Sequence, residues 1–361
     1  MRHERDEIEN GYLVSFDDAN GRWWNYYVFA EADAKIADPW LSVGAALRLD
    51  FVEDEWALQP AVSLTIRPGG GHTVSLSAGR AVRLPSRVTR DSRINVASFP
   101  FNIVAFITDD ELALEEVTKY QAAYIYDAGD AIRIKFALFL NQFDDLQSFR
   151  LMQPRGERYP FPTAHRLIPF ARANDGEGET AGAEVWVDWR LAARWRLNVG
   201  YSYVAADFKN ARGLERLHSL AAQAQLQSAN DLNLTGDAAT IISRTRTLLG
   251  LGQTDDLTSL SYINDGDIPR HHAHLWVQWS PHTTVDIDAI VRYVDALPGG
   301  AAAYTTADLR VAWRPNPAWE CAVSGQNLFA GDRVEARQSL LPIATASLVE
   351  PGVTASVRWQ F

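Results

Sequence analysis

The chain ends with the sequence PGVTASVRWQF, residues 351–361. Apolar residues at positions 353, 355, 357, 359 and 361 alternate with polar residues between them. A period of two residues predicts a β-strand with one apolar and one polar face. A soluble sandwich could contain such a strand. A final strand that ends on an aromatic residue, here Phe361, is also typical of outer-membrane β-barrels.

Thirteen further segments upstream are predicted to be strands, which gives fourteen in all. They cover residues 10–16, 23–36, 40–51, 57–66, 72–83, 117–126, 131–141, 183–190, 195–203, 272–279, 285–295, 304–314, 319–329 and 353–361. Short turns alternate with connections that are mostly long, and the longest cover residues 85–116, 142–180, 208–268 and 330–350. Short turns on one side and long loops on the other are typical of a transmembrane barrel. We therefore expect an all-β, antiparallel transmembrane β-barrel of about fourteen strands, with the four long loops outside the cell.

Composition excludes several other classes of protein. The net charge of −11 has no basic stripe to offset it, so we expect no nucleic acid partner. The single cysteine, Cys321, excludes an internal disulfide and a cysteine zinc site. No apolar stretch approaches the ~18 residues of a membrane-spanning helix. The charged N-terminus, MRHERDE, has no apolar segment of the kind found in a signal peptide, so we expect this chain to lack one of its own.

Tryptophan is abundant, with 12 residues, and half of these stand beside the short turns. An aromatic belt at one rim of a barrel would explain this placement. The residues predicted to form this girdle are Trp189, Trp195, Trp279, Trp313, Trp319 and Trp359.

Several motifs, taken in order, resemble a known family. GRAVRLPSR at 79–87, LEEVTKY at 114–120, GQNLF at 325–329 and the terminal RWQF are similar to segments of TonB-dependent outer-membrane receptors. The positions that carry the resemblance are Arg80, Pro85, Gly325, Asn327, Glu335 and Phe361. Arg80 interrupts the apolar alternation of its strand and indicates a β-bulge.

The resemblance implies a 22-stranded barrel filled by an N-terminal plug. Residues 1–361 would form part of the barrel domain, namely its last fourteen strands. It implies energy-coupled uptake of a scarce ligand such as a ferric siderophore or cobalamin, and a location in the bacterial outer membrane. Expected partners are outer-membrane lipid and lipopolysaccharide, the barrel-assembly machinery through Phe361, and a small-molecule metal chelate. TonB would be a partner only if the absent plug and TonB box were supplied. Two alternatives stay open: a self-contained passive channel of fourteen strands, and a fragment whose first strand has an unpaired edge.

Two groups of side chains are candidates for ligand binding. Arg83, Arg87, Arg90 and Arg93 cluster at the long-loop end of the fifth strand. They could attract an anionic chelate, or pair with lipopolysaccharide phosphates or nearby acids. His272 and His274 share one strand face, where they could bind a metal or haem or simply lie at the rim.

The polar face of the predicted strands is expected to line the lumen. Its residues are Glu184, Asp188, Arg196, Asn198, Asp286, Asp288, Arg292, Asp308, Arg310, Glu320, Gln326 and Arg358. The sequence has no nucleophile elbow or phosphate loop, so we expect no catalytic residue, metal or cofactor. An outer-membrane lipase or protease would need a Ser or Asp/His constellation at the rim, which the sequence does not provide.

Overall fold

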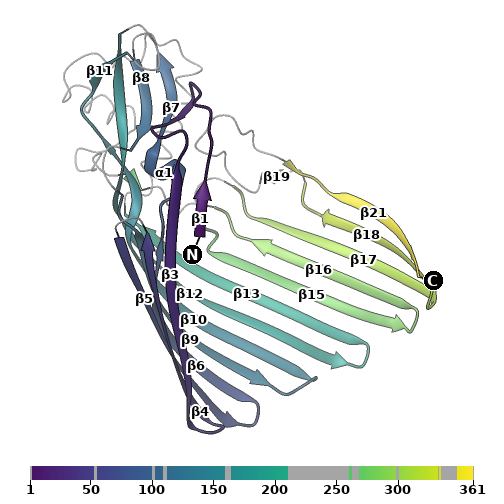
Figure 1. Ribbon diagram of the computed structural model, residues 1–361. Helices are drawn as coiled ribbons and strands as arrows, with labels where there is room; N and C mark the ends of the chain where they lie inside the picture. The colour runs from purple at the N-terminus through teal and green to yellow at the C-terminus, as the bar shows by residue number, and fades with distance from the viewer. Residues whose placement is uncertain are drawn as a thin grey trace.

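The computed structural model describes residues 2–52, 55–99, 102–108, 112–158, 164–209, 260–261, 268–297, 301–331, 333–334 and 348–360. Within these residues the chain is almost entirely strand, and the one helix, α1, has five residues (Figure 1). The all-β, antiparallel class expected from the sequence is confirmed. No helix in the described part of the chain has the length and apolar character needed to cross a membrane.

Thirteen of the described strands form one meander, in which each strand is antiparallel to the next. We call this meander the wall. Its strands are β3 (Arg22–Ala37), β4 (Leu41–Val52), β5 (Glu55–Gly69), β6 (His72–Arg83), β9 (Glu115–Asp127), β10 (Ile132–Leu151), β12 (His165–Ala192), β13 (Trp195–Phe208), β15 (His271–His282), β16 (Val285–Val294), β17 (Tyr304–Asn316), β18 (Trp319–Leu328) and β21 (Gly352–Trp359). Short turns close the hairpins along one rim (Figure 1).

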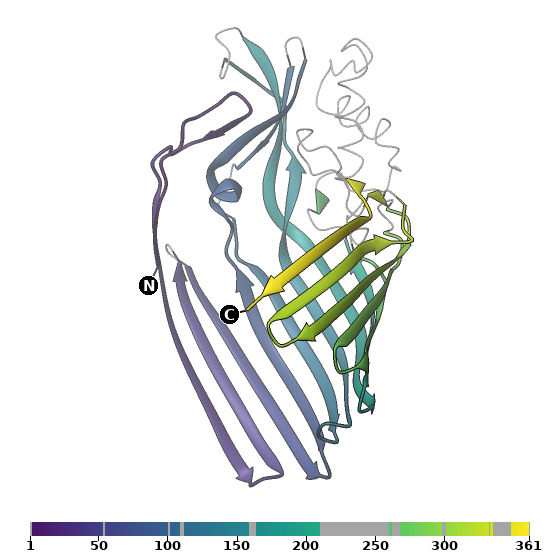
Figure 2. The same ribbon diagram turned by 90° about the vertical axis from the view of Figure 1, so that its right-hand side faces the viewer.

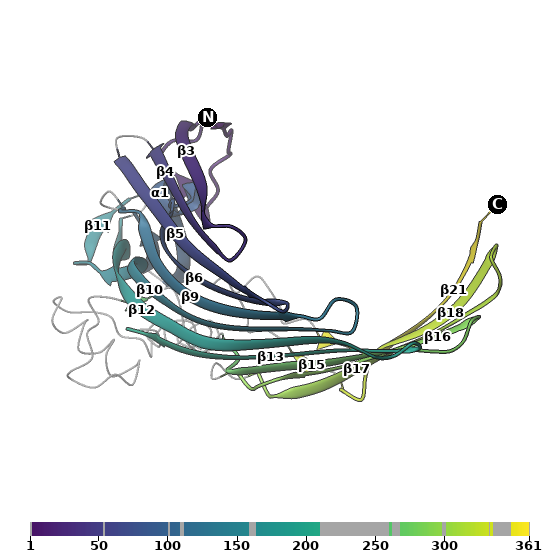
Figure 3. The ribbon, with the colours of Figure 1, turned by 90° about the horizontal axis from the view of Figure 1, so that it is seen from below.

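The wall is a curved, open sheet. Seen from below, β3 and β21 stand at opposite ends of the arc (Figure 3). Among the described residues, no ladder joins these two strands. Strand β1 (Arg2–Arg5) pairs with β3 only over Arg22–Asn25, so the rest of that edge has no described partner. In a meander of thirteen strands the first and last run in the same direction, so direct closure would create one parallel pair.

A small lobe stands above the long-loop rim on the N-terminal half of the wall (Figures 1 and 2). We call it the mouth lobe. It contains β2 (Val14–Phe16), α1 (Arg87–Asp91), β7 (Ser92–Phe99), β8 (Asn102–Ile107), β11 (Arg155–Glu157), β14 (Leu260–Ser261) and the ends of β10 and β12 beyond the rim. Its core consists of Ile103, Ala105, Ile107, Leu167 and Ala171, which are all buried. Strands β19 (Arg333–Val334) and β20 (Leu348–Val349) form a separate pair.

Two expectations about the connections were wrong. Residues 142–180, expected to form a long loop, are largely strand where they are described, because β10 and β12 continue past the rim and pair up to Leu151, with register shifts on either side of Leu146. Pro169 does not stop β12: its ring is fully buried, and its carbonyl accepts a hydrogen bond from the Met152 N–H. Residues 85–116 likewise hold α1, β7 and β8.

Two local predictions also failed. The strand expected at 10–16 is not a wall strand, because only Val14–Phe16 is extended and it pairs with β7. The Asn10 side chain exchanges hydrogen bonds with the Phe16 backbone and closes a loop instead. Arg80 does not mark a bulge, since β6 and β9 pair without a register shift from residue 72 to residue 83. It stays on the apolar face, where it forms an ion pair with Glu116.

Candidate functional site

The polar residues predicted to line the lumen lie on one face of the wall. This is because the strand ladders place them opposite one another, so they all point to the same side. Asp288 is directly opposite Arg310, and Glu320 is opposite Arg358. Opposite charges on neighbouring strands attract each other and so stabilise the ladder. Their attraction also offsets part of the free-energy cost of removing these side chains from bulk water. We call this surface the polar face.

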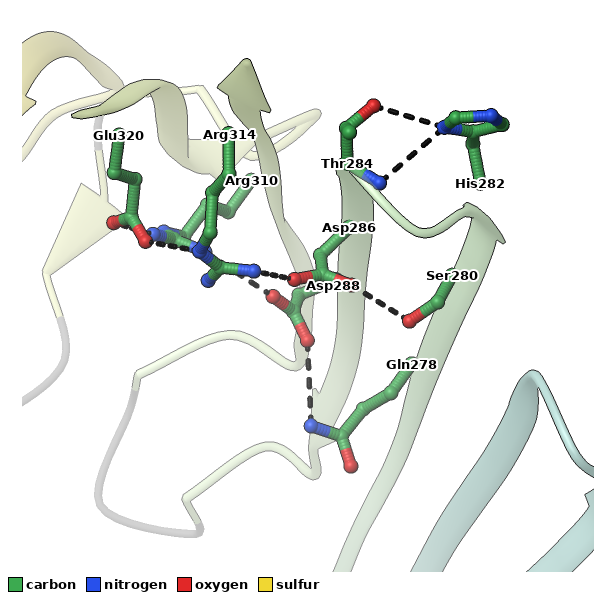
Figure 4. Close-up of polar contacts among 9 residues, drawn as sticks. All are labelled: Gln278, Ser280, His282, Thr284, Asp286, Asp288, Arg310, Arg314 and Glu320. Carbon is green, nitrogen blue, oxygen red and sulfur yellow. Dashed lines mark hydrogen bonds and ion pairs between the residues drawn. The ribbon is translucent and has the colours of Figure 1, made fainter. Parts of the chain in front are cut away.

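Near the short-turn rim, the polar face carries a network of charged and polar side chains over β15–β18 (Figure 4). Arg314 forms ion pairs with both Asp286 and Glu320. Arg310 donates to Glu320 at 2.8 Å and lies 3.6 Å from Asp288. The Ser280 hydroxyl donates to Asp286 at 2.6 Å and the Gln278 amide to Asp288 at 3.4 Å. The network joins four neighbouring strands by side chains as well as by backbone bonds.

We expect Arg314→Gln to lower the free energy of unfolding by about 1 kcal/mol. Arg314 has two carboxylate partners but is part-exposed, so its ion pairs stabilise the fold only somewhat more than one exposed ion pair does. The measurement is the urea midpoint of the protein in detergent micelles, at low and at high salt. The loss should shrink at high salt, because screening weakens exposed charge pairs. Arg190→Gln is the matched control, since Arg190 has one exposed partner, Asp130, at 3.3 Å. Equal effects of the two substitutions would contradict a network role for Arg314.

The arginines predicted to form one cluster are separated by the fold. Arg83 pairs with Glu115, its cross-strand partner on β9. Arg87 is nearly buried and forms ion pairs with Asp6 at 3.1 Å and Asp91 at 3.6 Å. Its guanidinium lies 4.7 Å from the centre of the Trp23 ring, and that of Arg90 lies 5.1 Å from the same ring. Of the three predicted residues, only Arg83 lines a cavity among the described pockets.

Arg93, the fourth arginine of the group, belongs to a part-buried cluster of the mouth lobe. Its guanidinium donates to both oxygens of Glu157, at 2.6 and 3.0 Å, and the His165 Nε2 lies 3.0 Å from the same carboxylate. Burial opposes ionisation of Glu157, but the bonds from Arg93 and His165 outweigh it and hold the pKa of that carboxyl below its usual 4.5.

The lobe should therefore resist mild acid. Because the pKa of Glu157 is lower in the folded protein, its stabilising effect is present above the unfolded value of 4.5 and is lost as pH falls through the folded value. Digestion with pepsin over a pH series should show protection of β11 and β12 at pH 4.5 that disappears only at lower pH. In Glu157→Gln that protection should be weaker and its pH dependence flatter. An unchanged pH profile in this variant would argue against the assignment.

The two histidines lie on the polar face but do not converge on a common point. The His274 Nε2 is 2.9 Å from the Asn198 side-chain oxygen, and its ring occupies the space above Gly200, where an added Cβ would lie 2.1 Å from the ring. His272 is exposed on the same face. His271, on the other face, is 2.8 Å from the Tyr201 hydroxyl. Among the described side chains, no group of three or more His, Cys, Asp or Glu is arranged to hold a metal ion.

The six predicted girdle tryptophans all lie on the apolar face at the short-turn ends of their strands. Trp195 stacks on Trp279 with ring centres 4.9 Å apart, and Trp319 stacks on Trp359 at 5.9 Å. Trp189 and Trp313 are 42% and 52% exposed, which is unusual for tryptophan unless another apolar phase covers it.

The motif residues have structural surroundings where they are described. Asn327 adopts φ +55° at the end of β18, its N–H donates to Asp308 at 2.9 Å, and its side-chain oxygen accepts from Arg333 at 3.1 Å. Pro85 lines the cavity beside Arg83. Gly325 lies directly opposite Leu309 of β17. Glu335 and Phe361 lie outside the described residues.

Sequence reasoning missed Glu115, Glu157 and Arg172. Each is buried or part-buried in the structure and has an arginine or backbone partner at least 32 residues away in the sequence, although Glu157 also contacts His165, eight residues on. No local pattern marks all three, because Glu157 stands in the charged stretch RGER at 155–158 and the distant partners cannot be read from the neighbouring residues.

Comparison with known proteins finds a family model that matches most of the chain. A family model described as "TonB dependent receptor-like, beta-barrel" matches residues 6–328. Among solved structures, the siderophore receptor PirA from Acinetobacter baumannii has a TM-score of 0.66 at 12% identity, covering 99% of this chain and 50% of its own. A mutant of the ferric enterobactin receptor PfeA from Pseudomonas aeruginosa has a TM-score of 0.59 at 14% identity, covering 87% and 40%.

A third similar structure, the copper transporter OprC, has a TM-score of 0.55 at 14% identity, covering 94% of this chain and 48% of its own. This chain thus spans half or less of the length of these three proteins. No curated protein sequence gives a significant match.

Proposed function

Since the chain belongs to the TonB-dependent receptor-like β-barrel family, whose members are outer-membrane proteins, we propose that it forms the C-terminal part of the barrel of a receptor for a scarce, chelated nutrient such as a ferric siderophore or cobalamin. The observation that carries the proposal is the open wall of thirteen antiparallel strands. In the described part of the chain, β21 has no partner on its outer side, and β3 pairs there only with β1 over Arg22–Asn25. Exposed edges of this length pair with further strands or aggregate.

The faces of the wall support a place in the outer membrane. The apolar face carries exposed residues such as Val43, Leu47, Val62 and Leu76, and the polar face carries paired charges. Lipid would cover the first surface and the lumen would solvate the second. Neither surface holds a constellation on which we would base an enzymatic function.

The nutrient class is supported by relatives that are named for ferric enterobactin and siderophores, whereas OprC is named for copper. Deletion of the gene in its source organism tests the proposal. We expect lower uptake of one member of a panel of ⁵⁵Fe-labelled siderophores and ⁵⁷Co-labelled cobalamin, restored by the intact gene. Unchanged uptake of every labelled ligand would overturn the proposed function.

The rival function is a passive channel formed by this chain alone, which requires β3 and β21 to meet. In a Cys321→Ser background, cysteines replacing Phe29 and Ser356 report that contact by forming a disulfide within one chain. We expect no such disulfide after oxidation, and no stable conductance in planar bilayers. A disulfide in high yield together with steady single-channel currents would favour the channel.

A further inference from the structure

The mouth lobe contains a cavity that is separate from the charge network on the polar face, since no residue of that network lines it. Its volume is about 480 Å³, within the ~300–1,000 Å³ usual for small-molecule sites. It lies between α1, the ends of β6 and β9, and the parts of β7, β8, β10 and β12 that pack around them. Its wall is mostly apolar and includes Leu84, Val88, Ile94, Phe106, Leu112 and Phe149.

Two nearly buried phenylalanine rings contribute to the cavity wall. Phe106 and Phe149 are 6% and 3% exposed, and their ring centres lie 4.3 Å apart at an interplanar angle of 40°. Arg172, also at the cavity wall, is 4% exposed and is held by hydrogen bonds to Ser92 and Thr108. Aromatic rings and a guanidinium in a cavity wall are groups that attract a planar aromatic ring, by offset stacking and by cation–π contact.

The charges around the cavity favour an anion. Arg83, Arg172 and Glu115 all line it, so two cations face one carboxylate. Glu115 is already engaged, because it accepts from the Arg83 Nε and from the Gln147 N–H. That bond orients Arg83, whose side chain stays 63% exposed at the mouth of the cavity. The terminal nitrogens of Arg83 can therefore form a charge-assisted contact with an incoming carboxylate.

We infer that this cavity binds a small aromatic anion, with its ring between Val88 and the Phe106–Phe149 pair and its acidic group at Arg83. Its biological meaning rests on the proposed receptor function, for which it would be a subsite at the long-loop side of the wall. Binding itself can be measured without transport, so the two proposals can fail separately. Loss of nutrient uptake on gene deletion without binding in this cavity would refute the inference alone.

The test is calorimetric titration of the full chain, refolded in detergent micelles, with 2-naphthoate, using protein-free micelles as the blank. We expect saturable binding with one site per chain. The neutral analogue 2-naphthylmethanol should bind at least about tenfold more weakly, because it cannot form the charge-assisted contact with Arg83. Absence of saturable naphthoate binding at millimolar concentration would overturn the inference.

Two variants locate the site. Arg83→Gln should weaken naphthoate about tenfold or more and leave the weak binding of the alcohol unchanged. Val88→Trp should abolish binding of both, because it fills the cavity from a position that is 46% exposed and bears little on the core. Arg190→Gln, an exposed arginine at the short-turn rim, should bind like the unaltered chain. Unchanged naphthoate affinity in either cavity variant would also overturn the inference.

Discussion

Replacing Arg172 with leucine is expected to lower the free energy of opening of the mouth lobe by about 3–5 kcal/mol. The Arg172 guanidinium donates to the Ser92 carbonyl at 2.6 Å, to the Ser92 hydroxyl at 3.1 Å and to the Thr108 hydroxyl at 2.9 Å. Leucine would remove these three charge-assisted bonds and leave the Ser92 carbonyl without this donor, while the two hydroxyls keep their bonds to the Val88 and Thr89 carbonyls. A buried polar atom that loses its partner costs about 1–3 kcal/mol.

Hydrogen exchange measured by mass spectrometry would report this effect on peptides from β7, β8 and the first half of β12, with wall peptides as an internal reference. The matched control is Arg150→Leu. Arg150 is on the neighbouring strand β10, but it is 45% exposed and pairs with Asp175 near the surface. It should cost less than about 1 kcal/mol. Similar losses in the two variants would show that Arg172 does not hold the lobe together.

Replacing Gly71 with alanine is expected to cost about 3 kcal/mol in the stability of the wall. Gly71 has φ +82° in the turn between β5 and β6, and a Cβ at this position would lie 2.0 Å from the backbone oxygen of Asp127. The left-handed conformation costs a non-glycine residue about 1–2 kcal/mol. The clash adds to this, because the Asp127 backbone must move, which disturbs its own bond to the Gly71 carbonyl at 2.9 Å.

Gly129→Ala separates these two contributions. Gly129 also has positive φ, +66°, in the next short turn, but nothing lies within 4 Å of the place that a Cβ would occupy there. It should show the conformational cost alone, about 1 kcal/mol. Urea titration in micelles, followed by tryptophan fluorescence, would compare the two variants. A Gly71→Ala protein as stable as Gly129→Ala would show that the turns at this rim are not in contact.

Much of the fold follows from local patterning. The alternation in residues 183–190 and 195–203 predicts two-faced strands because side chains of a strand point to alternate sides whatever its neighbours are. The short turns are equally local, since glycine at positions 69–71 supplies the positive φ that they require. The same reasoning failed at 142–180, which it assigned to a long loop. There β12 pairs with β10 and β8, and such pairing between distant segments outweighs the local sequence.

The candidate site was less predictable than the fold. Arg83, Arg87 and Arg90 are close in the sequence, so proximity suggested one anion-binding cluster. The five-residue helix α1 turns the chain between them, so Arg87 faces Asp6 and Asp91 while Arg83 faces Glu115. Whether an arginine is available to a ligand depends on its ion-pair partners, and two of these, Asp6 and Glu115, come from distant parts of the chain.

The sequence by itself determined the strand class, the division of each strand into an apolar and a polar face, and the alternation of short and mostly long connections. These depend on the two-residue period and on turn chemistry, which act over a few residues. The tertiary structure alone decided that Val14–Phe16 joins the mouth lobe, that the wall leaves β3 and β21 apart, and that a cavity forms behind α1. Those outcomes depend on ladder register and on packing between residues far apart in the chain, and a local pattern specifies which face a side chain takes but not which strand lies beside it.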